Sequence, residues 1–166
     1  TSNHDNNSWN GTEFERLCDG VEAFAVLTCL IPDMPLIYTG QEAGNNKRLS
    51  FFEKDIVEWK EHKLFNIYSK FFQLKKNNKA LQNGEQGGEV IYIQNSDEEN
   101  IFAFTRSSEK DKILAIFNLS NKHVEVELTA ESFQGSYKNF MTGKLETFSS
   151  KESFNLNPWE YRVYTK

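Results

Sequence analysis

The sequence predicts an α+β protein in which a helical first half is followed by an all-β second half. Before residue 80, apolar residues recur at helical spacing in two long stretches, with one short apolar run between them. After residue 88, short alternating runs separated by turn signals follow one another about every ten residues. A Gly-rich polar stretch over residues 82–88 separates the two patterns. We therefore predict two domains, residues 1–80 and residues 81–166.

The first helix is predicted to begin at Thr12. Thr12 and Glu15 have the spacing of a capping box, in which a hydroxyl and a carboxylate accept hydrogen bonds from free backbone N–H groups. The face that follows at helical spacing consists of Phe14, Leu17, Cys18, Val21, Phe24, Ala25 and Thr28. Cys18 and Cys29 would lie ~16 Å apart along this helix at ~1.5 Å per residue, which exceeds the ~7 Å that a disulfide can span. Both cysteines are therefore predicted to be free thiols.

A strand buried on both faces, as in a parallel sheet, is predicted over residues 34–39. It ends at the polar, flexible residues 40–44. A second amphipathic helix is predicted over residues 59–78, with Lys75 and Lys76 placed to complement the helix dipole. Its buried face is predicted to consist of Leu64, Ile67, Tyr68, Phe71 and Leu74. This order of loop, helix, buried strand and loop is typical of the last stretch of a repeated β/α fold.

The second half is predicted to be an antiparallel β-sandwich. Helical periodicity disappears there, and seven short runs alternate between apolar and polar residues. These runs cover residues 90–93, 101–104, 113–117, 124–128, 137–140, 145–148 and 161–164. We expect this sandwich to fold independently of the first half.

Length and charge exclude several classes of protein. A whole (β/α)8 barrel needs ~250 residues, so 166 residues hold at most part of one. The net charge of −5 and the absence of a basic, aromatic-interleaved stretch argue against nucleic acid and acidic membrane surfaces as partners. No apolar run approaches the ~18 residues of a membrane span. His4, His62 and His123 have no metal-ligand spacing, so neither a metal site nor a cofactor is predicted in this chain.

Two segments carry the strongest functional signal. Residues 1–9 read Thr-Ser-Asn-His-Asp-Asn-Asn-Ser-Trp, and residues 34–42 read Met-Pro-Leu-Ile-Tyr-Thr-Gly-Gln-Glu. In this order and at this spacing they resemble the α-amylase family of glycoside hydrolases, glycoside hydrolase family 13. The first looks like the family's fourth conserved motif, at the end of barrel strand 7, and the second like barrel strand 8. The resemblance implies that residues 1–80 are the last β/α units of a TIM (β/α)8 barrel, followed by the family's C-terminal β-sandwich.

The resemblance also assigns roles to individual residues. The family's fourth motif supplies a carboxylate that holds sugar hydroxyls and stabilises the transition state, and by motif position this residue is Asp5. His4 is implied to donate a hydrogen bond to the same sugar. Asn3, Trp9 and Arg48 are further substrate-binding candidates, with Asn3 expected mainly to orient the loop. The implied substrate is an α-glucan or maltooligosaccharide, cleaved by a retaining mechanism. Calcium, which many members bind, is expected to involve parts of the enzyme outside this sequence.

The chain alone is expected to be inactive. A retaining glycosidase needs a nucleophile and an acid ~5 Å apart, and no other Asp or Glu lies in a recognisable nucleophile or acid motif. The strand over residues 34–39 would have no parallel neighbours to pair with, and an unpaired strand invites association. We therefore expect the first ~80 residues to be partly rearranged or to self-associate through this strand.

Several alternatives stay open. The chain could instead be a non-catalytic carbohydrate-binding or structural sandwich module, for which Tyr92, Tyr137 and Trp159 are the candidate aromatic platform. The sequence does not distinguish hydrolysis from glucosyl transfer, because one mechanism serves both. It also leaves open whether the parent enzyme is cytoplasmic, periplasmic or secreted.

Overall fold

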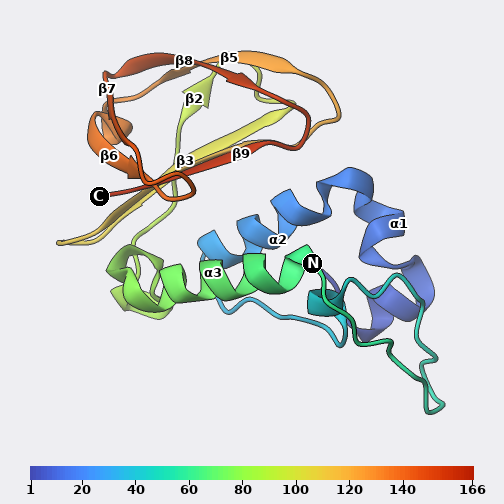
Figure 1. The fold of residues 1–166 in the computed structure, drawn as a ribbon. Coiled ribbons are helices and arrows are strands. Elements are labelled where there is room, and N and C mark those ends of the chain that lie inside the picture. Colours follow the sequence, from blue (N-terminus) through green and yellow to red (C-terminus); the bar gives the residue numbers. More distant parts are fainter. The chain divides into compact units, whose positions relative to one another are not determined.

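The computed structural model describes all 166 residues of the chain, which divide into two compact units (Figure 1). The first unit consists of Thr1–Cys29 and Met34–Leu74. The second consists of Leu30–Asp33 and Lys75–Lys166. The predicted division at residue 80 into a barrel fragment and a sandwich stays a prediction.

The first unit is built from helices and contains no β-strand. Its elements are the π-helix η1 (Asn6–Asn10), α1 (Glu13–Leu17), the 3-10 turn η2 (Cys18–Gly20), α2 (Val21–Leu30), the 3-10 turn η3 (Gln41–Ala43) and α3 (Lys63–Asn77). Leu30, the last residue of α2, and residues 75–77 at the end of α3 belong to the second unit. The chain between η3 and α3 has no regular structure, so it must satisfy its backbone groups in other ways.

The capping box at Thr12 is confirmed, but the helix it begins is short. The Thr12 hydroxyl accepts a hydrogen bond from the N–H of Glu15 at 3.2 Å, and Glu15 Oε2 accepts one from the N–H of Thr12 at 2.7 Å. The predicted single helix is interrupted at Cys18, whose φ of 49° lies outside the helical range. The sequence pattern missed this break because the apolar spacing continues through it. Cys18 and Cys29 are both free, as predicted.

The prediction of a buried strand over residues 34–39 is wrong. These residues form no strand, and the side chains of Met34 and Leu36 are exposed. Every strand pair in this chain is antiparallel and lies in the second unit. A strand requires a neighbour for its N–H and C=O groups, and here Tyr38 instead donates its N–H to the Gln41 side chain at 2.5 Å. Self-association through residues 34–39 stays a prediction.

Helix α3 follows the predicted pattern more closely. Leu64, Tyr68, Phe71 and Leu74 are buried, as expected from their spacing. The helix begins four residues later than predicted, at Lys63, just after His62, whose Nδ1 accepts a hydrogen bond from the N–H of Leu64 at 3.3 Å. A side chain that accepts from a free N–H at the first turn favours a helix start at that point.

The second unit contains the predicted antiparallel sandwich. Its strands are β1 (Ile91–Tyr92), β2 (Gln94–Asn95), β3 (Ile101–Ser107), β4 (Lys112–Asn118), β5 (Val124–Thr129), β6 (Gly135–Asn139), β7 (Leu145–Phe148), β8 (Lys151–Leu156) and β9 (Tyr161–Thr165). They form a six-stranded sheet of order β1-β3-β4-β9-β6-β7 and a three-stranded sheet of order β2-β5-β8. The 3-10 turns η4 (Lys79–Leu81), η5 (Gly84–Gln86) and η6 (Glu131–Phe133) complete the unit. Figure 1 shows the three-stranded sheet above the larger one.

Alternating side chains from both sheets fill the core of the sandwich. Strand β5 shows the pattern clearly, because Val124, Val126 and Leu128 are buried while their neighbours face outward. Its partner β8 was missed in the sequence because only Phe154 and Leu156 are apolar there. The buried core consists of Ile93, Ile101, Ala103, Leu114, Ile116, Val124, Val126, Leu128, Phe133, Tyr137, Phe148, Phe154, Leu156 and Tyr164.

A buried arginine joins segments of the second unit that lie far apart in sequence. Arg106 on β3 donates from Nε to the carbonyl of Gly88 at 2.8 Å, from Nη1 to that of Leu30 at 2.8 Å and from Nη2 to that of Gln82 at 3.1 Å. Its side chain is among the largest fully buried ones, and burial lowers its pKa. The planar guanidinium can serve three carbonyls at once, which a lysine cannot do in the same geometry.

We predict that Arg106→Met lowers the free energy of unfolding by roughly 3 kcal/mol, because the substitution leaves buried carbonyls without donors. Arg106→Lys is expected to fall between the wild type and Arg106→Met. Urea unfolding followed by circular dichroism measures the effect, with Lys122→Met, at an exposed position of the same unit, as the control. A loss no larger for Arg106→Met than for Lys122→Met would show that the three hydrogen bonds do not stabilise the unit.

Candidate functional site

The residues of the Asn-His-Asp motif lie in a short helical turn at the start of the first unit. Asn3 Oδ1 accepts a hydrogen bond from the N–H of Asn6 at 2.8 Å, and the Asn3 carbonyl accepts one from Asn7 at 2.9 Å. The side chains of His4 and Asp5 are both exposed, with Nε2 of the imidazole 3.5 Å from Oδ2 of the carboxylate. Asn3 therefore bonds within the turn while His4 and Asp5 are exposed, and the roles predicted for all three residues stay predictions.

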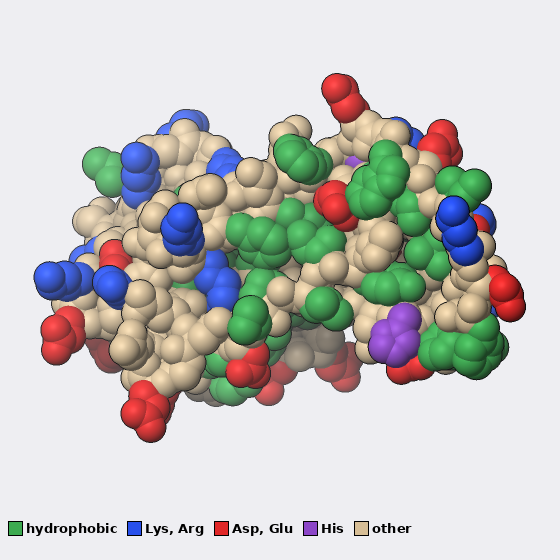
Figure 2. Space-filling view, turned by 90° about the horizontal axis from the view of Figure 1, so that it is seen from below, with side chains coloured by type: hydrophobic (Ala, Val, Ile, Leu, Met, Phe, Trp, Pro, Cys, Tyr) green, Lys and Arg blue, Asp and Glu red, His purple; other side chains and the backbone are tan.

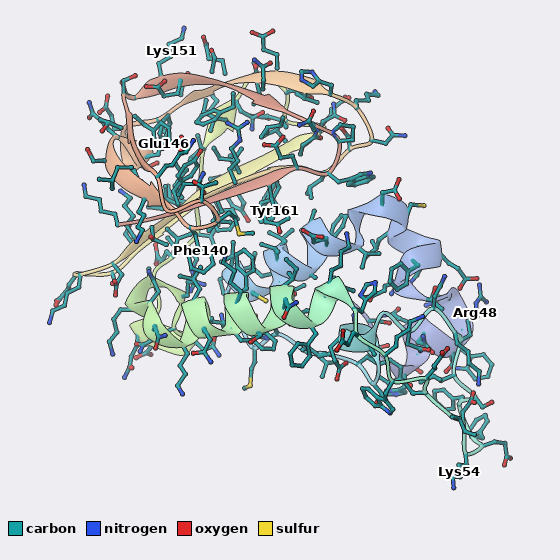
Figure 3. The ribbon with its side chains drawn as sticks, in the orientation of Figure 1. Arg48, Lys54, Phe140, Glu146, Lys151 and Tyr161 are labelled. Carbon is teal, nitrogen blue, oxygen red and sulfur yellow. The ribbon has the colours of Figure 1, made fainter.

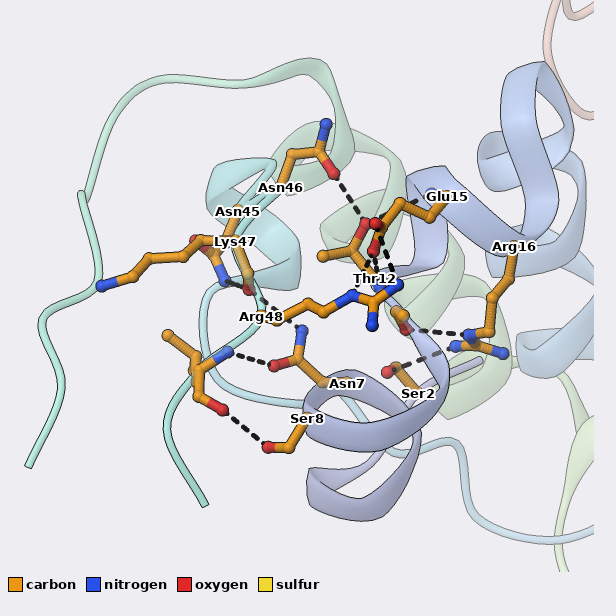
Figure 4. Close-up of polar contacts among 12 residues, drawn as sticks. Ser2, Asn7, Ser8, Thr12, Glu15, Arg16, Asn45, Asn46, Lys47 and Arg48 are labelled. Atoms are coloured by element: carbon orange, nitrogen blue, oxygen red, sulfur yellow. Dashed lines mark hydrogen bonds and ion pairs between the residues drawn. The ribbon is translucent and has the colours of Figure 1, made fainter. Parts of the chain in front are cut away.

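Two side chains of η1 bind the segment after η3 (Figure 4). The buried Asn7 donates from Nδ2 to the carbonyl of Lys47 at 3.2 Å and accepts at Oδ1 from the N–H of Leu49 at 2.7 Å. Ser8 donates from Oγ to the carbonyl of Leu49 at 2.7 Å. Asn7 thus pairs with the backbone on both sides of Arg48, as a neighbouring strand would. Residues 47–49 are therefore fixed beside the turn that carries His4 and Asp5.

Arg48 is held by an ion pair within the same region (Figures 3 and 4). Its Nε and Nη2 lie 2.9 and 3.1 Å from the two carboxylate oxygens of Glu15. The hydrogen bond from Arg48, together with that from the Thr12 N–H, lowers the pKa of Glu15 to about 2. The Thr12 hydroxyl also donates to Asn46 Oδ1 at 2.6 Å. Arg48 therefore anchors the segment, and its predicted contact with substrate stays a prediction.

Trp9 is exposed and belongs to a cluster of aromatic rings that includes His4. The Phe51 ring centroid lies 5.5 Å from that of His4, 5.3 Å from that of Trp9 and 4.7 Å from that of Phe52. Figure 2 shows hydrophobic side chains gathered in patches among charged ones on the face it draws, one of them beside a histidine. Phe51 and Phe52 are not among the residues predicted from the sequence to bind substrate. Two consecutive phenylalanines in a polar, irregular stretch were the available signal.

A buried carboxylate lies behind the motif. Glu13 Oε2 accepts hydrogen bonds from Gln41 Nε2 and from the Thr1 hydroxyl, the latter at 3.1 Å. Gln41 Nε2 also lies 3.4 Å from the Tyr68 hydroxyl, whereas Glu13 Oε1 has no hydrogen-bond partner. Burial raises the pKa of Glu13, and the hydrogen bonds from Gln41 and Thr1 oppose this rise. The burial of Glu13 is not apparent from the sequence, because an acidic residue in a first helical turn is usually exposed.

A cavity in the first unit and a cavity in the second unit both lie away from the motif. One of about 680 Å³ in the first unit is lined by Glu42, Ala43, Trp59, Lys60, Glu61, His62, Phe65 and Asn66. Another, of about 320 Å³, lies in the second unit between the β6–β7 hairpin and β9, near Glu146 and Tyr161 (Figure 3). There Glu146 accepts hydrogen bonds from Asn139 and Tyr164, each at 3.2 Å, and burial raises the pKa of Tyr164 to about 12. None of the predicted site residues lines either cavity.

The aromatic platform of the alternative interpretation does not form as a unit. Tyr137 is buried in the sandwich core, 5.9 Å from the Phe148 ring, so its inclusion in an exposed platform is wrong. Tyr92 is exposed and Trp159 is partly buried. No three His, Cys, Asp or Glu side chains gather closely enough to hold a metal ion. None of the helices has the length and apolarity that crossing a membrane requires.

Comparisons with known proteins find similarity to maltogenic amylases. Residues 92–163 match the family described as the maltogenic amylase C-terminal domain. The chain is 25% identical over 158 residues to a maltogenic α-amylase of Bacillus acidopullulyticus, an alignment that covers 92% of this chain and 26% of that protein. The maltogenic α-amylase AmyB from Thermotoga neapolitana is similar in structure, with a TM-score of 0.74 and 15% identity over 89% of this chain and 36% of AmyB.

A complex of AmyP with maltose is also similar, with a TM-score of 0.69 and 16% identity over 87% of this chain and 34% of AmyP. At these identities the likeness to solved structures shows the fold. The chain spans about a quarter of the length of the curated relative and about a third of the lengths of these two structures.

Replacing Glu13 with glutamine tests the buried carboxylate. Because burial raises the pKa of Glu13 above its ordinary 4.5, the folded chain binds a proton more tightly than the unfolded chain. The wild-type free energy of unfolding therefore falls as the pH rises from about 4.5 through the folded pKa. Glu13→Gln removes this loss, and we expect it to be more stable than the wild type at neutral pH by on the order of 1 kcal/mol. Urea unfolding followed by tryptophan fluorescence measures the difference.

Glu15→Gln is the matched control, because the pKa of Glu15 is lowered to about 2. The contribution of Glu15 to stability is present above its unfolded pKa and is lost as the pH falls toward the folded value. The difference in free energy of unfolding between Glu15→Gln and the wild type should therefore change at acid pH. Its change with pH should have the opposite sign to that of Glu13→Gln. A stability difference for Glu13→Gln that does not vary with pH would contradict the raised pKa of Glu13.

Proposed function

The chain carries the C-terminal domain of an α-amylase family protein, and we propose that the whole protein is a glycoside hydrolase acting on α-glucans such as starch and maltooligosaccharides. The observation that carries this proposal is that one chain combines this domain with an exposed His4–Asp5 pair. A carboxylate and an imidazole side by side offer an acceptor and a donor to neighbouring hydroxyls of one sugar ring. AmyP, which is similar in structure, has been solved in complex with maltose. This supports an α-glucan or maltooligosaccharide as the ligand.

In this proposal Asp5 stabilises the transition state. Its carboxylate accepts hydrogen bonds from sugar hydroxyls, and such bonds accelerate the reaction to the extent that they strengthen as the ring approaches its oxocarbenium-like form. His4 donates to a neighbouring hydroxyl of the same ring. Asn3 keeps both side chains oriented, because its own side chain is bonded to the backbone of Asn6.

The retaining mechanism also requires a nucleophile and a general acid ~5 Å apart. We infer that residues other than those of this chain supply both, since no further Asp or Glu here lies in a motif of either kind. The nucleophile would form the glycosyl-enzyme while the acid protonates the leaving oxygen, and water or another sugar would then complete hydrolysis or transfer. The 166-residue chain alone is therefore expected to release no sugar.

Asp5→Asn in the whole protein tests the proposal. The amide keeps the shape of the carboxylate but loses its charge, so kcat for release of reducing ends from maltohexaose is expected to fall by about 10²–10³-fold. KM should change less, because the lost interaction is strongest in the transition state. Asp19→Asn, at an exposed position of the same unit, is the control and should retain full activity.

Two results would contradict this account. Full activity of Asp5→Asn would remove Asp5 from the reaction. Release of reducing ends by the 166-residue chain alone, abolished by Asp5→Asn, would show that the nucleophile and the acid lie within these residues.

A further inference from the structure

An exposed aromatic cluster lies next to the turn that carries His4 and Asp5. Relative to full exposure, the residues Trp9, Phe51 and Phe52 are 59%, 39% and 82% accessible to solvent. Their rings nevertheless contact one another, with Phe51 in the middle and also against His4. Large apolar side chains gathered at the surface mark an interaction site more often than isolated ones do.

The loop that carries two of these rings is held in place before any ligand binds. On the side that precedes the rings, Asn7 fixes Leu49 through the hydrogen bond to its N–H at 2.7 Å. On the side that follows them, Asp55 accepts hydrogen bonds from the N–H groups of Ser50 at 2.9 Å and of Ile56 at 2.7 Å, and it pairs with Lys47. The loop is thus closed at its base by side chains, and such preorganisation lowers the entropic cost of binding.

Two ion pairs lie beside the cluster, and the adjacent Glu53 and Lys54 carry opposite charges. Arg48 pairs with Glu15, and Lys47 pairs with Asp55. The Lys47 ammonium and two backbone N–H groups hold the pKa of Asp55 well below its usual range, so this pair persists at ordinary pH. Surroundings that contain matched charges favour a neutral ligand over a strongly acidic or basic one.

The inclination of the rings narrows the choice of ligand further. The rings of Phe51 and Phe52 are inclined by 70°, and those of Trp9 and Phe51 by 40°. Such rings present faces at different inclinations and do not form one flat surface. Consecutive units of a curved α-glucan present their apolar C–H faces at different inclinations. Each unit also carries a rim of hydroxyls that His4 and Asp5 can bind.

We propose that Trp9, Phe51 and Phe52 form an aromatic platform on which successive glucosyl units of an α-glucan stack, beside the hydroxyl-binding pair His4 and Asp5. The proposal rests on the proposed function and deepens it, because it assigns Phe51 and Phe52 to the recognition of chain length. A glucan long enough to reach both the pair and the platform binds more tightly than one that reaches the pair alone.

Calorimetric titration of the 166-residue chain with maltohexaose and with maltotriose tests the platform. Phe52→Ala is expected to raise the Kd for maltohexaose about tenfold, the effect of losing one good aromatic contact. The Kd for maltotriose should change less, because a shorter chain covers less of the platform. Phe52→Trp should retain the wild-type affinity. Since Phe52 is the most exposed of the three rings, its removal leaves the packing of the unit intact.

Phe65→Ala is the matched control. Phe65 lies on α3, is 60% accessible to solvent, and belongs to the same unit but not to the platform. Its replacement should leave both dissociation constants unchanged. Equal weakening by Phe65→Ala and Phe52→Ala would show that any lost aromatic surface reduces binding, and this result would overturn the platform.

Other outcomes separate the platform from the proposed function. Unchanged affinity in Phe52→Ala would overturn the platform, whereas the proposed function would still be judged by the activity of Asp5→Asn. Absence of maltohexaose binding to the wild-type chain would also overturn the platform, with the same activity assay left to decide the function. If sedimentation showed a dimer that Phe52→Ala converts to a monomer without affecting sugar affinity, the rings would be an interface between two copies of the chain.

Discussion

The side-chain amide of Asn7 is the contact on which the first unit's site depends. This unit has no β-strand, so backbone groups in its irregular segments require partners other than a neighbouring strand. Asn7 supplies both a donor and an acceptor to the backbone on either side of Arg48, and it is buried. This pairing places the loop with Phe51 and Phe52 against the turn with His4. Without it, residues 47–49 would keep only the Ser8–Leu49 hydrogen bond of the three that join them to η1.

In the second unit, too, a buried polar side chain bonds the backbone of distant segments at two positions. Arg106 serves three carbonyls, and the fully buried Asn118 donates to the carbonyls of Lys122 at 2.7 Å and Asn157 at 2.8 Å. Asn118 Oδ1 accepts from the N–H and the hydroxyl of Ser120 at 3.1 and 2.7 Å. Buried polar side chains with satisfied hydrogen bonds make the loops that they join rigid, and losing one such side chain leaves buried carbonyls without donors. Glu13 differs, because one of its carboxylate oxygens is buried without a partner.

The sequence predicts features that depend on residues close together in the chain better than features that depend on contacts between distant residues. Capping at Thr12 and the buried face of α3 follow from local spacing, and the sandwich follows from alternation along each strand. The prediction of a strand over residues 34–39 failed because a strand needs a neighbouring strand to pair with. An apolar composition does not show that such a neighbour is present. The contact of Phe51 with Trp9 and the ion pair of Arg48 with Glu15 could not be found by local pattern, because these partners are distant in sequence. Contacts such as that of Asn7 with Leu49 bring them together.

The central claim is that an α-glucan binds the first unit at the His4–Asp5 turn and not the sandwich. A crystal structure of the chain with maltohexaose tests it most directly. The account predicts electron density for a glucosyl ring within hydrogen-bond distance of Asp5, with the chain continuing over the Phe52 ring. Sugar density confined to the sandwich, at Tyr92 or in the cavity beside Glu146, would contradict it. That result would instead establish the sandwich as a carbohydrate-binding module.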